Sequence, residues 1–153
     1  MTLKTSKNGI ELIKQFEGCR LKAYKCPAGV LTIGYGHTGN VNGKPITADL
    51  TITPLMAETL LAIDLQKFEK CINDNVKKPL TQNEFDSLAS FVFNIGTGAF
   101  LQSTMLKLLN SGHIPLAAGQ FDRWNKITVN GKKVVSKGLT RRRLAEKTLF
   151  LTK

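Results

Sequence analysis

The chain has 153 residues, of which 42% are hydrophobic and 22% are charged. This length and composition suit one globular domain, or two small lobes that share a core, and they exclude a disordered or fibrous chain. The formal net charge of +11 favours an anionic partner such as nucleic acid, anionic lipid or an acidic cell wall, and charge alone does not choose among them. We therefore predict a single domain over residues 1–153.

The first part of the chain combines a helix with a small sheet. Apolar residues recur at helical spacing up to Phe16, and Gly18 is typical of a helix end, so we expect Glu17 in the last helical turn. The stretch Leu21–His37 consists of short β-type runs broken by proline and glycine, which predicts a small antiparallel sheet. Residues 40–50 read as a loop.

The rest of the chain is predicted to be helical, with one hairpin. Thr53-Pro54 should begin a long helix that ends near residue 75, because proline is favoured at the first helical position. The capping-box pattern from Thr81 to Glu84 predicts a helix that ends near residue 96. Further helices are expected from residue 103 to before 112, from 115 to about 125 and from 140 to 151. Between the last two, Val129-Asn-Gly-Lys132 predicts a β-hairpin.

Three side chains near the first glycine-rich run suggest hydrolytic chemistry. Glu17 is followed nine residues later by Cys26 and six residues after that by Thr32, within FEGCRLKAYKCPAGVLTIGYGHTG. This order places an acid, a thiol and a hydroxyl around one short hairpin. Cleavage of a glycosidic bond needs a proton donor and an activated water or nucleophile, and this set can supply both.

The spacing Glu-x8-Cys-x5-Thr with the following GYGHTG resembles the phage-type lysozymes, the endolysins of glycoside hydrolase family 24. The stretches SLASFVFNIGTGAFLQSTMLKLLN and GLTRRRLAEKTLF are also typical of that family, and the match runs from about residue 9 to 150. The resemblance implies a lysozyme-like α+β fold with a small N-terminal β-sheet lobe and a larger helical C-terminal lobe. An extended polymer would lie in the cleft between the lobes.

By this resemblance, Glu17 is the general acid and Cys26 takes the second catalytic position, where many relatives carry aspartate. A thiolate there has three open roles: it activates water with inversion, attacks the sugar with retention, or helps to position a water held by Thr32. Gly36 lets the backbone approach the substrate, and His37 is a polar anchor near the site.

Three residues further along the chain are predicted to support the site. Asn94 and Ser103, in the central motif, are candidates for substrate contact, and the two glycines Gly96 and Gly98 suggest a tight turn at a helix end. Arg142 matches the arginine of the family pattern in GLTRRRLAEKTLF, and the resemblance implies that it approaches Glu17 and holds it in place. Trp124 is expected in the core rather than as a sugar platform.

Other sequence features limit the cofactors and partners that we expect. Cys19, Cys26 and Cys71 are odd in number and lack metal-ligand spacing, so we expect free thiols and no metal, although a disulfide of Cys26 with either of the others would be a redox switch. No apolar run reaches the ~20 residues of a membrane span, and the N-terminus lacks the apolar core of a signal peptide. The basic segment from 126 to 147 is either a solvated face or a surface that attracts an anionic polymer. It contains no motif typical of nucleic-acid recognition.

The sequence thus predicts a muramidase that cleaves the β-1,4 bond between N-acetylmuramic acid and N-acetylglucosamine in peptidoglycan. It would need no cofactor, no nucleic acid and no membrane insertion, and a monomer is the default expectation. The resemblance implies synthesis in the host cytoplasm and release to the wall through a separate holin. Two alternatives stay open: a lytic transglycosylase, which cuts the same bond without water, and a non-catalytic cationic wall binder on a lysozyme scaffold.

Overall fold

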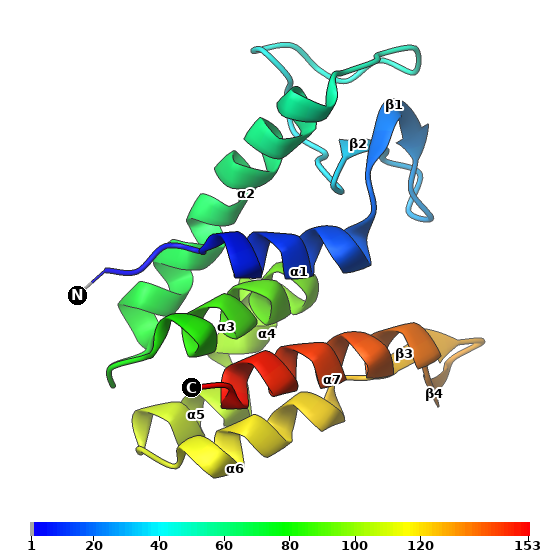
Figure 1. Ribbon diagram of the computed structural model, residues 1–153. Helices are drawn as coiled ribbons and strands as arrows, with labels where there is room; N and C mark the ends of the chain where they lie inside the picture. Colours follow the sequence, from blue (N-terminus) through cyan, green and yellow to red (C-terminus); the bar gives the residue numbers. More distant parts are fainter. Residues whose placement is uncertain (1) are drawn as a thin grey trace. The chain divides into compact units, whose positions relative to one another are not determined.

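A computed structural model describes residues 2–153 and shows a mainly helical chain with two small antiparallel hairpins (Figure 1). The chain forms two compact units, one of Ile13–Gln66 and one of Lys67–Lys153 together with the N-terminal segment up to Leu12. In chain order the elements are α1 (Lys7–Glu17), β1 (Arg20–Lys25), β2 (Leu31–Gly34), α2 (Pro54–Asn75), α3 (Gln82–Ile95), α4 (Thr97–Leu101), α5 (Thr104–Asn110), α6 (Ile114–Gly119), the 3₁₀ turn η1 (Gln120–Arg123), β3 (Lys126–Val129), β4 (Lys132–Val135) and α7 (Lys137–Leu151).

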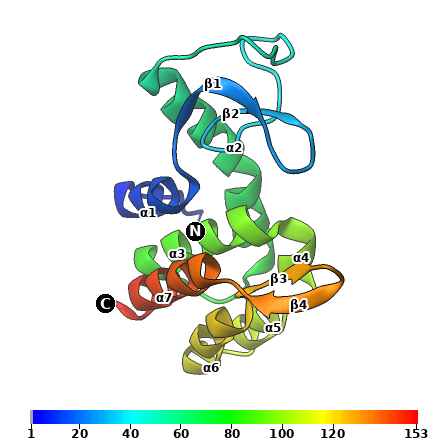
Figure 2. The ribbon, with the colours of Figure 1, turned by 90° about the vertical axis from the view of Figure 1, so that its right-hand side faces the viewer.

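The unit Ile13–Gln66 is organised around the hairpin of β1 and β2. Its two strands lie side by side (Figure 2) and pair antiparallel. Tyr24 lies opposite Thr32 in the register. The loop that follows β2 returns to the hairpin, because Lys22 forms a bridge with Thr51. One small apolar cluster fills this unit: Ile33, Val41, Ile46, Ile52, Ala57 and Leu60.

The other unit is a helical assembly around α3. Its buried residues run along the whole middle of α3, from Phe85 to Val92, and α7 lies beside it (Figures 1 and 2). Aromatic rings reinforce this core: Phe91 meets Phe121 edge to face with ring centroids 5.2 Å apart, and Phe121 meets Phe150 at 5.5 Å. Edge-to-face packing adds stabilisation beyond the area that the rings bury.

The N-terminal segment is bound into the helical unit by polar contacts to residues far along the chain. The backbone N–H of Leu3 donates to Asn73 at 3.1 Å, and that of Thr5 donates to Glu69 at 2.8 Å. Ser6, directly before α1, donates to the fully buried carboxylate of Asp86 through both its backbone N–H and its hydroxyl. The start of α1 is therefore fixed on α3.

Most of the predicted elements are confirmed. Helix α1 ends at Glu17, where Gly18 has a positive φ of 70°, and α2 runs from Pro54 to Asn75. The capping box at Thr81 is present, and the β3–β4 hairpin turns at Asn130-Gly131. Among the described residues, no helix is long and apolar enough to span a bilayer.

Three boundaries differ from prediction. The prediction of a tight turn at Gly96 and Gly98 is wrong in part, because Gly98 belongs to the short helix α4. The helix expected to end near residue 125 ends at Gly119 and continues as η1. The last helix begins at Lys137 rather than 140, since the hydroxyl of Ser136 accepts from the N–H of Leu139 and caps it.

Candidate active site

Glu17 occupies the last position of α1, where the helix is stopped by Gly18. The side chain is partly buried. Gly36 passes next to the carboxylate, because a Cβ placed on it would lie 3.6 Å from Glu17 Oε1. Gly36 also has a φ of 80°, in the region that favours glycine. The fold therefore brings the predicted acid and the GYGHTG run together.

Cys26 and Thr32 meet across the turn between β1 and β2. The backbone N–H of Cys26 donates to the carbonyl of Val30 at 3.0 Å, and its carbonyl accepts from the N–H of Gly29 at 2.8 Å. The hydroxyl of Thr32 donates to the same Val30 carbonyl at 2.9 Å, and Thr32 is buried. One carbonyl thus orients both the residue that carries the thiol and the hydroxyl.

The environment of Cys26 favours its thiolate. Hydrogen bonds from the backbone of Val30, and then of Ala28, lower the pKa of the thiol, and partial burial opposes this. Donors aimed at an anion stabilise its charged form. A thiol with a lowered pKa can act as a base or nucleophile nearer neutral pH than a free one.

His37 is a buried anchor in the same unit. Its Nδ1 lies 2.8 Å from one oxygen of Asp64, and its Nε2 lies 3.0 Å from the carbonyl of Asn40. Both partners only accept hydrogen bonds, so both are satisfied when the ring is an imidazolium. Burial lowers the pKa of His37, but the hydrogen bonds to Asp64 and Asn40 outweigh it, and the net direction is upward.

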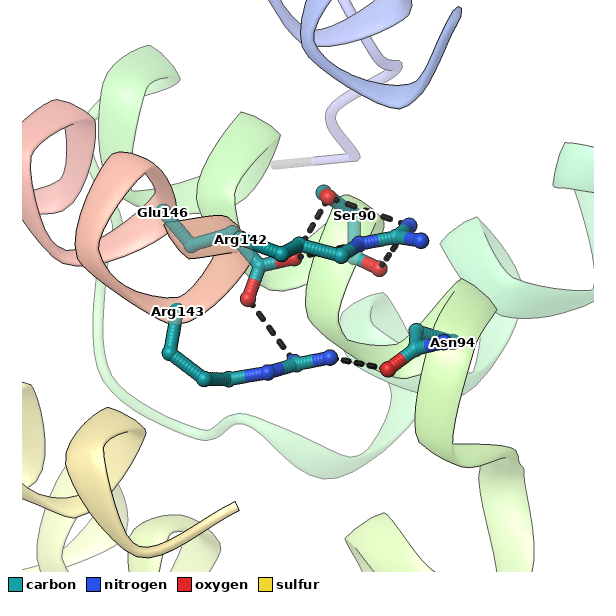
Figure 3. A network of polar contacts seen from close by, with 5 residues as sticks. All are labelled: Ser90, Asn94, Arg142, Arg143 and Glu146. Carbon is teal, nitrogen blue, oxygen red and sulfur yellow. Dashed lines mark hydrogen bonds and ion pairs between the residues drawn. The ribbon is translucent and has the colours of Figure 1, made fainter. Parts of the chain in front are cut away.

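The helical unit holds a buried network of polar side chains between α3 and α7 (Figure 3). Glu146, which is fully buried, accepts from Ser90 Oγ at 2.5 Å, from Arg142 Nε at 3.2 Å and from Arg143 at 2.8 Å. Arg142 also donates to the carbonyl of Ser90 at 3.1 Å. Arg143 donates to Oδ1 of Asn94, which fixes the orientation of that exposed amide. Paired in this way, the buried charges avoid the large cost of an isolated ion.

Sequence reasoning did not single out Ser90, Arg143 or Glu146 as parts of this network. The spacing Arg-Arg-x-x-Glu places Arg142 and Arg143 four and three residues before Glu146, so all three lie on one helical face. This spacing is the signal that could have predicted the two ion pairs on α7. Ser90 lies 56 residues from Glu146, so no local pattern reveals it.

Comparison with known proteins agrees with these observations. The family model described as Phage lysozyme matches residues 14–146, which include Glu17, Cys26, Thr32 and Arg142. The chain belongs to the phage lysozyme family. It is 48% identical over 145 residues to the endolysin of Acyrthosiphon pisum secondary endosymbiont phage 1, a match that covers 95% of this chain and 96% of that protein. Phage lysozymes hydrolyse peptidoglycan, and this chain is an endolysin of that class that acts on the cell wall.

Solved structures show the same fold. The muramidase domain of SpmX from Asticaccaulis excentricus superposes with a TM-score of 0.91 at 44% identity, covering 98% of this chain and 99% of that one. A mutant of P22 lysozyme superposes with a TM-score of 0.89 at 41% identity, covering 98% and 99%. The predicted lysozyme-like α+β fold is confirmed.

The remaining predicted residues of this phage lysozyme lie in the helical unit. Ser103 is buried, donates to the carbonyl of Phe100 at 2.7 Å and accepts from the N–H of Leu106 at 3.1 Å, so its hydroxyl caps α5. Its substrate contact stays a prediction. So does the approach of Arg142 to Glu17, which belong to different units.

Asn94 lines a pocket of about 900 Å³ in the helical unit. Trp124 also lines it while packing edge to face on Phe91 at 5.7 Å, so the tryptophan serves the core and a surface pocket together. The other lining residues are Ile95, Thr104, Gln120, Arg123, Lys126, Ile127, Thr128, Lys133 and Leu139.

Proposed function

We propose that this endolysin is a muramidase, which hydrolyses the β-1,4 bond between N-acetylmuramic acid and N-acetylglucosamine. The observation that carries this proposal is that the Val30 carbonyl accepts from both the Cys26 backbone N–H and the Thr32 hydroxyl, in the unit that also holds Glu17. The relative SpmX, whose matching domain is named a muramidase, supports the same bond specificity.

Glu17 donates its proton to the leaving sugar oxygen in this proposal. A positioned acid of this kind contributes roughly 10²–10⁴-fold to a rate. Gly36 keeps the neighbouring backbone close to the carboxyl without a side chain in the way.

Cys26 and Thr32 prepare the water that attacks the other side of the sugar. The Thr32 hydroxyl has one hydrogen, which the Val30 carbonyl binds at 2.9 Å, so its oxygen is left to accept from a water. That water places its second hydrogen on the Cys26 thiolate, which removes it as the oxygen bonds to the anomeric carbon. Because Thr32 and Cys26 together bind the attacking water in this proposal, it favours hydrolysis over the reaction of a transglycosylase, which uses no water.

The first test compares the wild type with Glu17→Gln on purified peptidoglycan. Glu11→Gln is the matched control, because Glu11 is an exposed glutamate on the same helix. We expect Glu17→Gln to lose at least about 10²-fold in clearing rate, while Glu11→Gln keeps the wild-type rate. Circular dichroism of all three proteins separates loss of chemistry from loss of fold.

Product analysis decides the reaction class. Mass spectrometry should find reducing N-acetylmuramic ends that borohydride converts to alcohols. Anhydro-muramic ends would instead establish a transglycosylase. If neither the wild type nor Glu17→Gln clears peptidoglycan while both still bind it, the non-catalytic wall binder would be favoured.

A further inference from the structure

The β3–β4 hairpin exposes aliphatic side chains that no part of the proposed reaction uses. Its register pairs Ile127 with Val134 and Val129 with Lys132. Directly paired residues share one face of a ribbon, and alternate residues along a strand do so as well. Ile127, Val129 and Val134 therefore form one apolar face, edged by Lys132. Their side chains are 46%, 45% and 41% exposed.

The opposite face of the hairpin is mixed, and it borders a pocket of its own unit except at Val135, which is 60% exposed. Lys126, Thr128 and Lys133 lie on that face and line the 900 Å³ pocket beside α3 and η1. Ile127 lines this pocket as well, although it belongs to the apolar face by register. Val129 and Val134 have no such role, so packing within the unit does not account for the apolar face.

The charge around the hairpin is of one sign. Between Arg123 and Ala145 the sequence has eight lysines and arginines and no carboxylate. Arg142 and Arg143 are buried with Glu146, so the other six are available to a partner at the surface. These six exposed residues are Arg123, Lys126, Lys132, Lys133, Lys137 and Arg141.

We propose that the hairpin docks the protein on an anionic lipid bilayer. A hydrated anionic polymer would neutralise the lysines but leave the three aliphatic side chains in water. A bilayer interface offers both partners, because apolar side chains enter the boundary between headgroups and acyl chains while lysines bind the headgroup phosphates. The two-residue turn Asn130-Gly131, with φ values of 50° and 78°, holds the strands in register and presents the face as a ribbon.

Docking of this kind is peripheral. It is independent of the proposed bond specificity, since it uses none of Glu17, Cys26 or Thr32. It places the enzyme at a membrane surface of the bacterial envelope.

Vesicle co-sedimentation of the full chain tests the proposal. The vesicles contain phosphatidylglycerol in phosphatidylcholine, or phosphatidylcholine alone. The test variant carries Ile127→Thr, Val129→Thr and Val134→Thr, which keep β-branched side chains and so preserve strand propensity. The control variant carries Leu101→Gln, Leu116→Gln and Leu151→Gln, which alter exposed apolar residues elsewhere in the helical unit. Circular dichroism and thermal unfolding check that both variants fold.

We expect the wild type and the control to bind the anionic vesicles and the threonine variant to bind at least about tenfold more weakly, since membrane affinity scales with the apolar area that is buried. Trp124, the only tryptophan, lies two residues before β3 and gives a second readout. Brominated acyl chains should quench its fluorescence in the wild type and much less in the threonine variant.

Three results would overturn the proposal. Equal binding of the wild type and the threonine variant would show that surface charge alone binds the vesicles and that the apolar face contributes nothing. No binding of the wild type to anionic vesicles would show that a lipid bilayer is not the partner. Self-association of the wild type in lipid-free sedimentation, abolished in the threonine variant, would assign the apolar face to a second copy of the chain.

Discussion

The family resemblance places the Cys26 thiol at a position where many relatives have a carboxylate. Backbone donors of Val30 and Ala28 lower its pKa. These contacts explain how a thiol can stand in for an acid that is ionised at neutral pH. A hydroxyl in the same place has no comparable ionised form and should fail as a base.

We therefore expect Cys26→Ser to lose about 10²–10⁴-fold in clearing rate, as removal of a general base does, while Cys26→Asp keeps most of it. The wild-type rate should rise with pH as the thiol ionises. In Cys26→Asp this rise should move to lower pH, because a carboxyl has a pKa of about 3.9. A pH–rate profile of the three proteins checks this. Wild-type activity in Cys26→Ser would leave the thiol without a chemical role.

The His37–Asp64 pair should make stability depend on pH. The pKa of His37 is raised in the folded protein, so its contribution is complete below the unfolded value of about 6.5 and is lost as pH rises through the folded value. Asp64→Asn removes the charged partner. We expect it to lower the free energy of unfolding by about 1.5–3 kcal/mol near pH 5, and by less at alkaline pH.

Urea unfolding at several pH values measures this difference. Asp49→Asn is the control in the same unit, because Asp49 is an exposed carboxylate that accepts from the hydroxyl of its near neighbour Thr47. A deficit in Asp64→Asn that stays constant from pH 5 to alkaline pH would show that the ring is not charged in the folded protein.

Local sequence patterns predicted the candidate catalytic residues, but they did not predict hydrogen-bond partners that lie far away in the sequence. Glu17, Cys26 and Thr32 lie within 16 residues, and their spacing alone suggested the chemistry. By contrast, Asp64 lies 27 residues from its partner His37, and Ser90 lies 56 residues from its partner Glu146. A hydrogen bond across such a separation exists only because helices pack, so nothing in the local sequence indicates it.

At the scale of elements, the junction of α1 and α3 depends on the small size of Gly9. A Cβ added there would lie 2.6 Å from Thr5 Cγ2 and 2.8 Å from Asp86 Cγ. Alanine usually stabilises a helix interior by about 1 kcal/mol over glycine. Here the overlap should reverse that sign, because Asp86 is buried and held by hydrogen bonds to Ser6 and Gln82.

We expect Gly9→Ala to lower the free energy of unfolding by about 1–3 kcal/mol, which thermal unfolding should register as a lower midpoint. Gly119→Ala is the control, since no heavy atom lies within 4 Å of a Cβ at Gly119. An increase in the stability of Gly9→Ala would mean that Thr5 moves aside at little cost.

Helix starts with a local cap were predictable, and those with competing signals were not. Thr81 and Glu84 lie next to each other in space because they are three residues apart, and the capping box formed as expected. The last helix was predicted from residue 140, but Thr140 lies inside α7, where its hydroxyl donates to the carbonyl of Ser136 one turn earlier. Helix α4 was missed because Gly96 and Gly98 favour a turn, although Gly98 is helical.

At the scale of the whole molecule, the charge of +11 should speed the approach to an anionic wall. Raising the ionic strength from about 0.01 M to about 1 M shortens the Debye length from about 30 Å to about 3 Å. Clearing of peptidoglycan should then slow by about tenfold or more. Cleavage of a short soluble oligosaccharide of N-acetylmuramic acid and N-acetylglucosamine, which carries few charges, is the control and should change much less. A parallel loss of both activities would point to an effect of salt on the site itself.

The helical unit is built from two stretches of chain, and this sets an order on its assembly during translation. Residues 2–12 leave the ribosome before their tertiary partners in the helical unit, since residues 13–66 belong to the other unit. At about 5–20 residues per second, these 54 intervening residues take roughly 3–11 s to make. The nascent N-terminal segment must wait for Glu69, Asn73 and Asp86 to be synthesised, so α1, which ends at Glu17, is anchored at its first turn only after more than half of the protein exists.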